Sequence, residues 1–301
     1  MGGSRFVSAL ADGSLITGEL TPPRGADPAV LIAQAESWAG HVDAAHVNDC
    51  LLATARMSNL AAAALMRGTG LEPVLQFSLR HRNRIALQSD LLGAHAVGVR
   101  GLVLLSGYDL KVGSDPDAKE SGDLRTAPAI GLTRRFSDQG RFFNGDRLDS
   151  APNFMVGAVE SIGPGDPHAQ VERVEAKIAA GVQWLQVQGA FDIETAVAWY
   201  DAMYEAGVHE RARLVGAVIP FRSIERLHVL DRVPGIRIPA EAWARMRARD
   251  DESEGFDMAR EVAAALQDHP AVSGVHIRPF GWEDIVPPLA SALRPATIPV
   301  G

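Results

Sequence analysis

The first residue able to do chemistry is a carboxylate at the end of an apolar run. Glu19 lies near the end of the run from Ser14 to Leu20, and Thr21-Pro22-Pro23-Arg24 follows directly. A carboxyl group on an apolar strand beside two prolines is expected to lose solvent, which raises its pKa and suits it to general acid catalysis. An ion pair with Arg24, or a position at the rim of the sheet, explains the same residues equally well.

An amide side chain is the second candidate. Gln186 and Gln188 are two residues apart at the end of another apolar run, so both side chains lie on the same face of the predicted strand. An amide offers one donor and one acceptor group and can bind the edge of a planar heterocycle. From the residues alone, a structural amide with satisfied hydrogen bonds is the slightly better explanation.

Further polar residues stand where other apolar runs end. Asn48 ends the second run, Gln76 lies near the end of the third, and Arg278 follows the last. Asp109 follows the fourth run in a Gly-Tyr-Asp turn, where an aspartate caps a turn more often than it binds a ligand. These four residues are binding candidates because a parallel sheet collects its functional groups at the carboxyl ends of its strands.

Metal and nucleotide motifs are missing from the sequence. The nine histidines show no metal-ligand spacing, and a single cysteine, Cys50, excludes an internal disulfide and a cysteine-based metal site. We therefore predict no metal, and we interpret Cys50 as a buried, unreactive thiol. Gly-x-Gly-x-x-Gly, Gly-x-x-x-x-Gly-Lys and Gly-x-Ser-x-Gly do not occur.

The elements that must position these residues alternate regularly. Short apolar runs, typical of buried parallel strands, alternate with stretches of helical spacing. The predicted strands are Ser14–Leu20, Val42–Asn48, Pro73–Leu79, Leu102–Leu105, Phe154–Val159, Trp184–Val187, Leu214–Ile219 and Gly274–Ile277. A predicted helix follows each strand except the fourth, which is followed by an irregular stretch; the helix after the seventh strand is Ser223–Leu230. Eight such units favour a closed (β/α)₈ (TIM) barrel of the α/β class, residues 1–301 forming one domain, over an open doubly wound sheet.

Two segments interrupt this alternation. The polar, glycine-rich segment from Lys111 to Asp149 is expected to be irregular, either as a lid or as a disordered stretch. The segment from Ile238 to Asp268 carries apolar residues at helical spacing and is predicted to be an extra helical insertion before the last strand.

Composition and charge exclude several classes of protein. The chain has 301 residues, of which 47% are hydrophobic and 22% charged, as in a soluble protein with a sizeable core. Lys+Arg 29 against Asp+Glu 37 gives a net charge of −8, which argues against nucleic acid or an anionic membrane as a partner. No apolar run is long enough to span a bilayer and no targeting segment is recognised, so we expect a cytoplasmic protein.

Several segments together resemble one enzyme family. Gly18-Glu19-Leu20-Thr21-Pro22-Pro23-Arg24-Gly25 resembles the Glu-x-x-Pro-Pro-Arg start of methylenetetrahydrofolate reductases. Residues Arg82–Ala94, continuing to Leu105-Ser106-Gly107, resemble the third helix and fourth strand of that family. Phe154–Ala158, Lys177–Gly181 and Gln188 then follow in the family's order. The resemblance covers most of the chain.

The resemblance implies a reaction and a role for several individual residues. Members are (β/α)₈ barrels of one-carbon metabolism and methionine biosynthesis that reduce 5,10-methylenetetrahydrofolate to 5-methyltetrahydrofolate with NADH or NADPH, in most cases through bound FAD. Glu19 then matches the acid that assists opening of the folate five-membered ring, and Gln188 matches a pterin-binding glutamine. We expect Asp109, Gln76 and Asn48 to contact the folate as well. Lys177 matches a flavin-phosphate lysine, and Arg278 is the other expected cofactor contact.

The departures from the family pattern concentrate on the flavin side. Gln76 stands where a histidine is common, Val159–Ile162 replace a tyrosine and a histidine, and Asp109 is one residue out of step. We therefore expect FAD to bind poorly or not at all, with direct hydride transfer from the nicotinamide. The alternatives are a conventional FAD-dependent reductase and a non-catalytic folate-binding barrel that partners a methyltransferase. The oligomeric state stays open.

Overall fold

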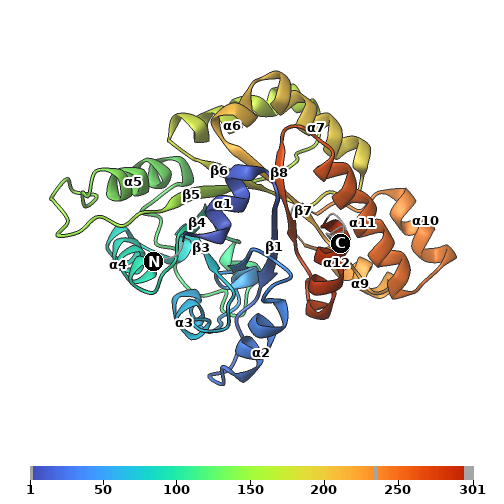
Figure 1. Ribbon diagram of the computed structural model, residues 1–301, viewed down its shortest axis with the longest axis horizontal. Coiled ribbons are helices and arrows are strands. Elements are labelled where there is room, and N and C mark those ends of the chain that lie inside the picture. The colour runs from blue at the N-terminus through green and yellow to red at the C-terminus, as the bar shows by residue number, and fades with distance from the viewer. Residues whose placement is uncertain (1–2, 234–235, 295–301) are drawn as a thin grey trace, which may run out of the picture.

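Eight parallel strands close into a barrel in chain order (Figure 1). The computed structural model describes residues 3–233 and 236–294. The strands are β1 (Leu15–Leu20), β2 (Ala44–Val47), β3 (Pro73–Ser78), β4 (Gly101–Leu105), β5 (Met155–Glu160), β6 (Trp184–Val187), β7 (Arg213–Val218) and β8 (Val272–Ile277). Each lies within two residues of its predicted bounds. The predicted (β/α)₈ fold is confirmed.

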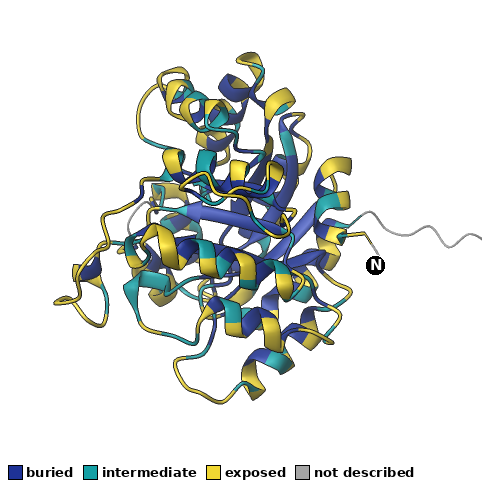
Figure 2. Cartoon of the chain, turned by 90° about the vertical axis from the view of Figure 1, so that its left-hand side faces the viewer, coloured by how far each residue is buried: buried dark blue, intermediate teal, exposed yellow. Residues whose placement is uncertain are grey.

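Closure places the first and last strands side by side. Thr17 of β1 pairs with Ala44 of β2 on one side and with His276 of β8 on the other. All six residues of β1 are buried, because side chains on one face fill the barrel and those on the other face meet the surrounding helices. Figure 2 shows the resulting pattern, in which buried strands lie inside helices whose outer faces are exposed.

Twelve α-helices are described. They are α1 (Arg5–Asp12), α2 (Ala29–Trp38), α3 (Asn59–Leu65), α4 (Arg84–Ala96), α5 (Thr126–Asp138), α6 (Pro167–Ala179), α7 (Ile193–Glu205), α8 (Val208–Arg211), α9 (Ile224–Leu230), α10 (Ala240–Ala248), α11 (Glu252–Gln267) and α12 (Val286–Leu293). Capping side chains begin several of them; Asn83, for example, accepts hydrogen bonds from the backbone of Ile85 and Ala86 at the start of α4. Within the described residues, none of the helices has the length and apolar character needed to cross a membrane.

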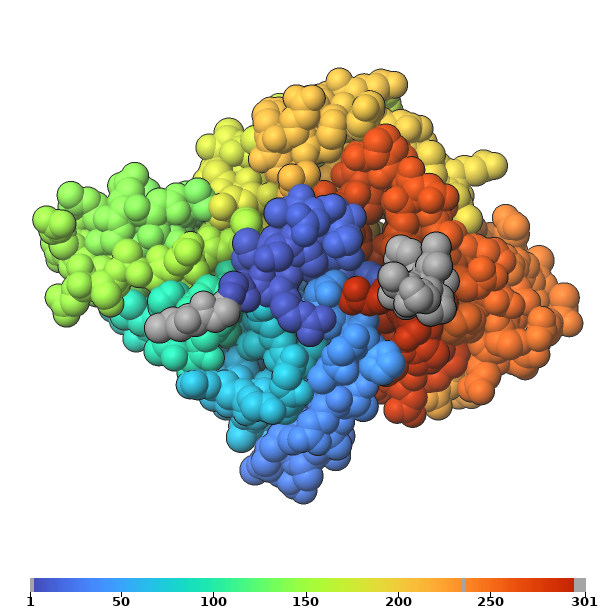
Figure 3. All heavy atoms as spheres, viewed as in Figure 1, coloured from blue at the N-terminus to red at the C-terminus, as the bar shows by residue number. Residues whose placement is uncertain are grey.

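Helix α1, which the sequence analysis missed, closes the amino-terminal end of the barrel. Phe6 and Leu10 on this helix are fully buried, and the Phe6 ring lies 5.2 Å from the Trp184 ring, edge to face. Gly101 leaves room for Phe6, since a Cβ there would come within 2.7 Å of its ring. Residues of the amino-terminal segment cover the centre of this face in Figures 1 and 3. Helix α1 therefore covers the amino-terminal end of the barrel interior.

The helical insertion is not where the sequence placed it. Helix α11 packs against β7 and β8, and its residues Val262 and Leu266 belong to the main core, so α11 is the crossover helix of the seventh unit. The predicted crossover helix, α9, instead packs with α10 in a separate cluster that includes Leu227 and Met246. The extra elements are therefore α9 and α10, and the prediction of 238–268 as the insertion is wrong for α11.

The segment from Lys111 to Asp149 is also more regular than predicted. Helix α5 occupies its middle and buries Ile130 and Phe136 against the main core between β4 and β5. Pro128 and Gly131 hide this helix from sequence patterns, but a proline in the first turn lacks only a hydrogen bond that the helix would not make there. The helix is the fourth crossover of the barrel, so the expectation of an irregular segment is wrong for residues 126–138.

Removing the Phe6 side chain tests the role of α1. We expect Phe6→Ala to lower the free energy of unfolding by about 3–5 kcal/mol, because a buried aromatic ring leaves a cavity among Trp184, Gly101 and their neighbours. Urea unfolding followed by circular dichroism measures this change. Ser8→Ala, an exposed change on the same helix, is the control and should stay within about 0.5 kcal/mol of the parent. Equal stabilities of the two variants would contradict the assignment.

Candidate functional site

A pocket of about 310 Å³ opens at the carboxyl ends of the strands. We call it the inner pocket. Its lining includes Glu19, Asn48, Gln76, Gln188, Lys177 and Arg278. These residues come from β1, from the ends of β2, β3, β6 and β8, and from helix α6. Six of the seven residues that the sequence singled out for catalysis or binding therefore meet in one place.

Glu19 forms the centre of this pocket. Its side chain is 5% exposed, and its Oε2 lies 3.3 Å from the Arg278 Nε and 3.3 Å from the Gln76 Nε2, both of which donate to it. The Nε2 of His276 lies 3.6 Å from the same oxygen. The partner of the carboxylate is thus Arg278, while Arg24, the partner considered from the sequence, is exposed.

The pKa of Glu19 moves in the direction opposite to the expectation. Burial by itself would raise the pKa, but the charge of Arg278 and the contacts with His276 and Gln76 outweigh burial and hold it well below its usual value. Glu19 is therefore an ionised carboxylate in the free protein. The prediction of a raised pKa is wrong because it considered the loss of solvent without the buried cation from β8.

A buried network supports Glu19 from inside the barrel. The Nδ1 of His276 lies 2.9 Å from the Thr17 Oγ1, and the His276 ring stacks on His46 with 4.2 Å between centroids. The His46 Nδ1 lies 2.8 Å from the Gln186 Oε1. Burial lowers the pKa of both histidines, so both are neutral at pH 7. Gln186 thus has a structural role as the hydrogen-bond partner of His46. His276 is a neighbour of Glu19.

Two acceptor groups of the inner pocket are unsatisfied. The Gln188 Oε1 and the Asn48 Oδ1 are buried and have no hydrogen-bond partner among the described residues. The other side of the Asn48 amide donates to the Thr21 Oγ1 at 2.7 Å, which fixes its orientation. Leaving a buried polar atom unpaired costs about 1–3 kcal/mol, so such atoms in a pocket indicate where a ligand donates. A ligand with N–H groups along one edge fits these two positions.

Arg278 is held firmly in the pocket wall. Burial would lower the pKa of its guanidinium, but Glu19 and the Tyr108 hydroxyl raise it above the usual value. The guanidinium carbon also lies 4.7 Å from the centroid of the Phe280 ring. Tyr108 was not assigned a role from the sequence, although its position just after the fourth strand was the signal that could have found it.

Lys177 reaches the inner pocket, but a protein carboxylate already binds its ammonium group. The Lys177 Nζ lies 2.6 Å from the Glu160 Oε2 and donates at 2.6 Å to the Val159 carbonyl. The Glu160 side chain is 2% exposed and also accepts from the Arg173 guanidinium at 2.7 Å. Lys177 and Arg173 thus neutralise a buried acid, which leaves less positive charge for a phosphate group.

Asp109 is the predicted site residue that the structure does not bring to the pocket. It is exposed, and its Oδ1 accepts from the backbone N–H of Lys111, which caps the short 3₁₀ turn Leu110–Val112. This is the turn-capping role that its residue type and position favoured. Tyr108, one residue earlier, lines the pocket instead.

One cluster near the pocket has the residue types of a metal site. Asp49, Cys50 and His81 present ligand atoms within 4.8 Å of one another. However, the Asp49 carboxylate already accepts from the Arg82 guanidinium and from the Ser78 backbone N–H. Burial raises the pKa of the half-buried Cys50 thiol, which keeps it protonated and a poor ligand. The geometry favours a structural ion pair over a metal centre.

The overall likeness to solved structures shows the fold. An uncharacterized protein from Clostridium thermocellum, described as binding two copies of 5-methyl-5,6,7,8-tetrahydrofolic acid, is 12% identical over 95% of this chain and 97% of its own, with a TM-score of 0.66. Two structures of tryptophan synthase from M. tuberculosis are 13% and 12% identical over 97% and 98% of this chain and 99% and 100% of their own, with TM-scores of 0.55 and 0.56. At these identities the likeness establishes the barrel alone.

Sequence comparison is more specific. No curated protein matches the chain. The family model of methylenetetrahydrofolate reductase, in contrast, matches residues 6–292, which span every strand of the barrel and every residue of the inner pocket. The chain therefore belongs to the methylenetetrahydrofolate reductase family.

Proposed function

We propose that this protein reduces 5,10-methylenetetrahydrofolate to 5-methyltetrahydrofolate with NADH or NADPH as the hydride donor. The observation that carries the proposal is the inner pocket, where the buried carboxylate of Glu19 meets the free amide oxygens of Gln188 and Asn48. Membership of the family supports the reaction class. The C. thermocellum barrel, which binds 5-methyltetrahydrofolic acid, supports a folate as the ligand.

The amides account for recognition of the pterin. A pterin presents adjacent N–H groups along one edge, and Gln188 Oε1 and Asn48 Oδ1 are acceptors without partners. Gln76 is less available, because its Nε2 already donates to Glu19. We assign Gln188 and Asn48 to the pterin edge and Gln76 to the orientation of the carboxylate.

Glu19 acts on the ring-opening step. Protonation of a weakly basic ring nitrogen opens the five-membered ring and leaves an electrophilic iminium cation, which then accepts the hydride. An ionised Glu19 stabilises that cation electrostatically. To donate the proton as well, Glu19 must first become protonated, which requires that the bound folate weaken its contact with Arg278. We propose that folate binding separates these two side chains.

We further propose that the hydride passes directly from the dihydronicotinamide to the iminium carbon, without FAD. The ammonium of Lys177, at the position that matches a flavin-phosphate lysine, is paired with Glu160. The inner pocket, at about 310 Å³, is at the lower end of the range of about 300–1,000 Å³ for small-molecule sites, which is small for a flavin dinucleotide. One hydride carries both electrons, so the step balances without another carrier.

A non-catalytic folate-binding protein is the second candidate. The C. thermocellum barrel is described only as binding 5-methyltetrahydrofolic acid, and the same pocket chemistry would serve binding alone. Such a protein would bind the folate without oxidising NADH or NADPH.

The Glu19→Gln variant tests the catalytic assignment. Glutamine keeps the size of the side chain but carries neither the charge nor a transferable proton, so kcat should fall by roughly 10²–10⁴-fold. NADH oxidation with methylenetetrahydrofolate measures the loss. Because the change leaves the buried Arg278 without its anion, circular dichroism must show that the variant is folded. Turnover equal to that of the parent would remove Glu19 from the mechanism.

The Gln188→Ala variant tests recognition of the pterin. Loss of the free amide oxygen should weaken 5-methyltetrahydrofolate binding by about tenfold, which corresponds to one hydrogen bond of about 1.4 kcal/mol. Isothermal titration calorimetry gives the dissociation constant. Gln139→Ala, an exposed glutamine at the end of α5, is the matched control and should bind like the parent. An unchanged affinity in Gln188→Ala would contradict the assignment.

A visible spectrum and an assay in one cuvette test direct hydride transfer. We expect a colourless protein that oxidises NADH or NADPH only after methylenetetrahydrofolate is added, with no flavin present. A yellow protein whose turnover depends on the bound flavin would return it to the conventional FAD-dependent mechanism. A colourless protein that binds the folate but oxidises neither nucleotide would favour the second candidate.

A further inference from the structure

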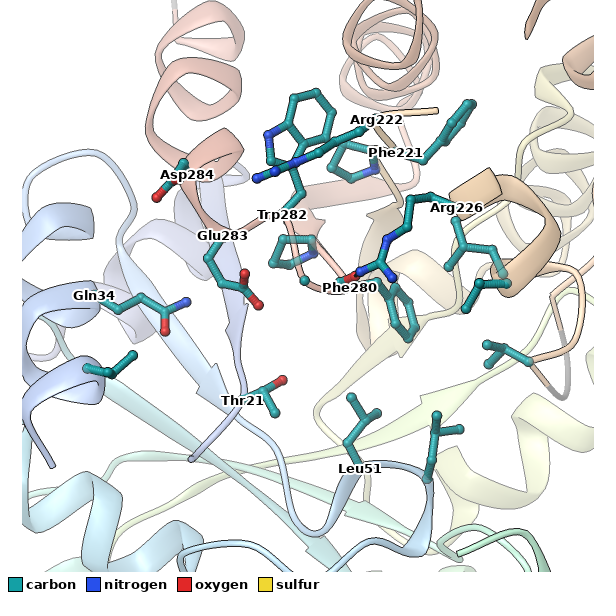
Figure 4. Close-up of a pocket in the computed structure, with 18 of the residues that line it drawn as sticks. Thr21, Gln34, Leu51, Phe221, Arg222, Arg226, Phe280, Trp282, Glu283 and Asp284 are labelled. Atoms are coloured by element: carbon teal, nitrogen blue, oxygen red, sulfur yellow. The ribbon is translucent and has the colours of Figure 1, made fainter. Parts of the chain in front are cut away.

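A second and larger cavity, of about 860 Å³, lies beside the inner pocket. We call it the outer pocket. It is bounded by α2 on one side and by the loops that follow β7 and β8 on the other, as Figure 4 shows. The proposed function uses none of its polar side chains. Its volume falls within the range of small-molecule sites, toward the large end.

The two pockets share a wall. Leu51 lines both of them. Thr21 lines the outer pocket, and its hydroxyl accepts from Asn48, which lines the inner one, at 2.7 Å. The two pockets are therefore direct neighbours at Leu51. Hydride transfer needs the reacting atoms about 3–3.5 Å apart, so a reactant bound in the outer pocket must extend past Leu51 into the inner pocket.

Three arginines and two acidic residues, Glu283 and Asp284, line the outer pocket, which leaves a small excess of positive charge. Arg56, Arg222 and Arg226 line it, and none of them forms a salt bridge within residues 3–233 and 236–294. The Arg222 guanidinium lies over the Trp282 ring, 5.4 Å from its centroid, and Arg226 donates to the Phe280 carbonyl at 3.0 Å. These contacts hold the two guanidinium groups at the cavity and leave other N–H donors free.

Arg56 supplies independent evidence of an anion site. Its Nε is buried and has no partner among the described residues, while its Nη1 donates to the Pro22 carbonyl at 3.0 Å. Burial and the charge of Arg24 lower the pKa of Arg56, although the charge of Glu283 acts in the opposite direction. Bidentate binding of phosphate oxygens is the usual use of such a guanidinium.

The opposite wall has the chemistry of hydroxyl recognition. In Figure 4 the Glu283 carboxylate faces the cavity between Gln34 and Thr21. The Gln34 Nε2 is buried without a partner in the part of the chain that the structure describes. A carboxylate accepts from ribose hydroxyls but repels the carboxylates of a folate glutamate tail. A ligand with phosphates at one end and ribose hydroxyls nearby fits both walls.

Backbone strain marks the same cavity. Leu52 and Phe280 line the outer pocket with φ of 54° and 44°, in the left-handed region that residues other than glycine rarely adopt. Such conformations persist where the surrounding structure holds them, and they cluster at ligand sites. Phe280 also supplies the carbonyl that accepts from Arg226.

We propose that the outer pocket binds the nicotinamide dinucleotide. Arg56, Arg222 and Arg226 bind its pyrophosphate, Glu283 accepts from a ribose hydroxyl, and the nicotinamide ring extends past Leu51 to the pterin. The inference deepens the proposed function and rests on it. It assigns the second reactant to a cavity distinct from the one that holds the pterin.

ADP-ribose tests the site without the nicotinamide or the reaction. Isothermal titration calorimetry of the intact protein with ADP-ribose and with NADH should show binding to the parent. Arg222→Gln and Arg56→Gln should each weaken both ligands by about tenfold, as expected for one charge-assisted contact. Arg213→Gln is the matched control, because Arg213 is exposed at the opposite end of β7. The affinity for 5-methyltetrahydrofolate should stay unchanged in all three variants.

The outcomes separate this proposal from the proposed function. If the arginine variants weaken 5-methyltetrahydrofolate triglutamate and leave ADP-ribose unaffected, the pocket holds the glutamate tail and the proposal is overturned. If the parent oxidises NADH with the folate but the arginine variants bind ADP-ribose like the parent, the site assignment alone fails. If the parent neither binds NADH nor oxidises it, the proposed function fails first. Arg222 is exposed, so its variant is expected to fold.

Discussion

The structure depends on the buried carboxylate of Glu19, whose negative charge is balanced by a buried arginine. Glu19 lies in the barrel interior with Arg278 as its cation, and desolvation makes the charges costly unless each keeps its partner. Beneath Glu19, Thr17 pairs with His276 and His46 pairs with Gln186 through hydrogen bonds. The same arrangement sets the chemistry, because a ligand that changes the contact between Glu19 and Arg278 changes the protonation of the acid.

The two ends of the barrel have different tasks. At the amino-terminal end, Phe6 and Leu10 of α1 exclude solvent and contribute to stability. At the carboxyl end the strands lead into two adjoining pockets, one with free amide oxygens and one lined by guanidinium groups that form no salt bridge within the described residues. This division suits a reaction between two ligands, because each pocket offers its own chemistry and the two pockets adjoin at Leu51. The extra helices α9 and α10 lie outside the barrel. Helix α9 lines the outer pocket and supplies Arg226.

The order of strands and helices could be predicted because local sequence patterns indicate each of these elements. Each strand is a short apolar run, and alternation with helical spacing indicates a parallel sheet wherever it occurs. Local patterns could not assign the seventh crossover, because α9 and α11 both carry an apolar face and only packing distinguishes them. Helix α5 was missed since Pro128 and Gly131 weaken its propensity, whereas burial of Phe136 stabilises it.

The sequence by itself determined the fold, the strand ends at which Glu19 and Gln188 stand, and, through its resemblance, the family. Only the tertiary structure decided the state of Glu19. Its cation lies 259 residues away in sequence, and barrel closure brings β8 beside β1. Closure also determined that Arg56 and Arg222 face one cavity. Charge interactions depend on distance and burial in space, and neither quantity is contained in the spacing of residues along a chain.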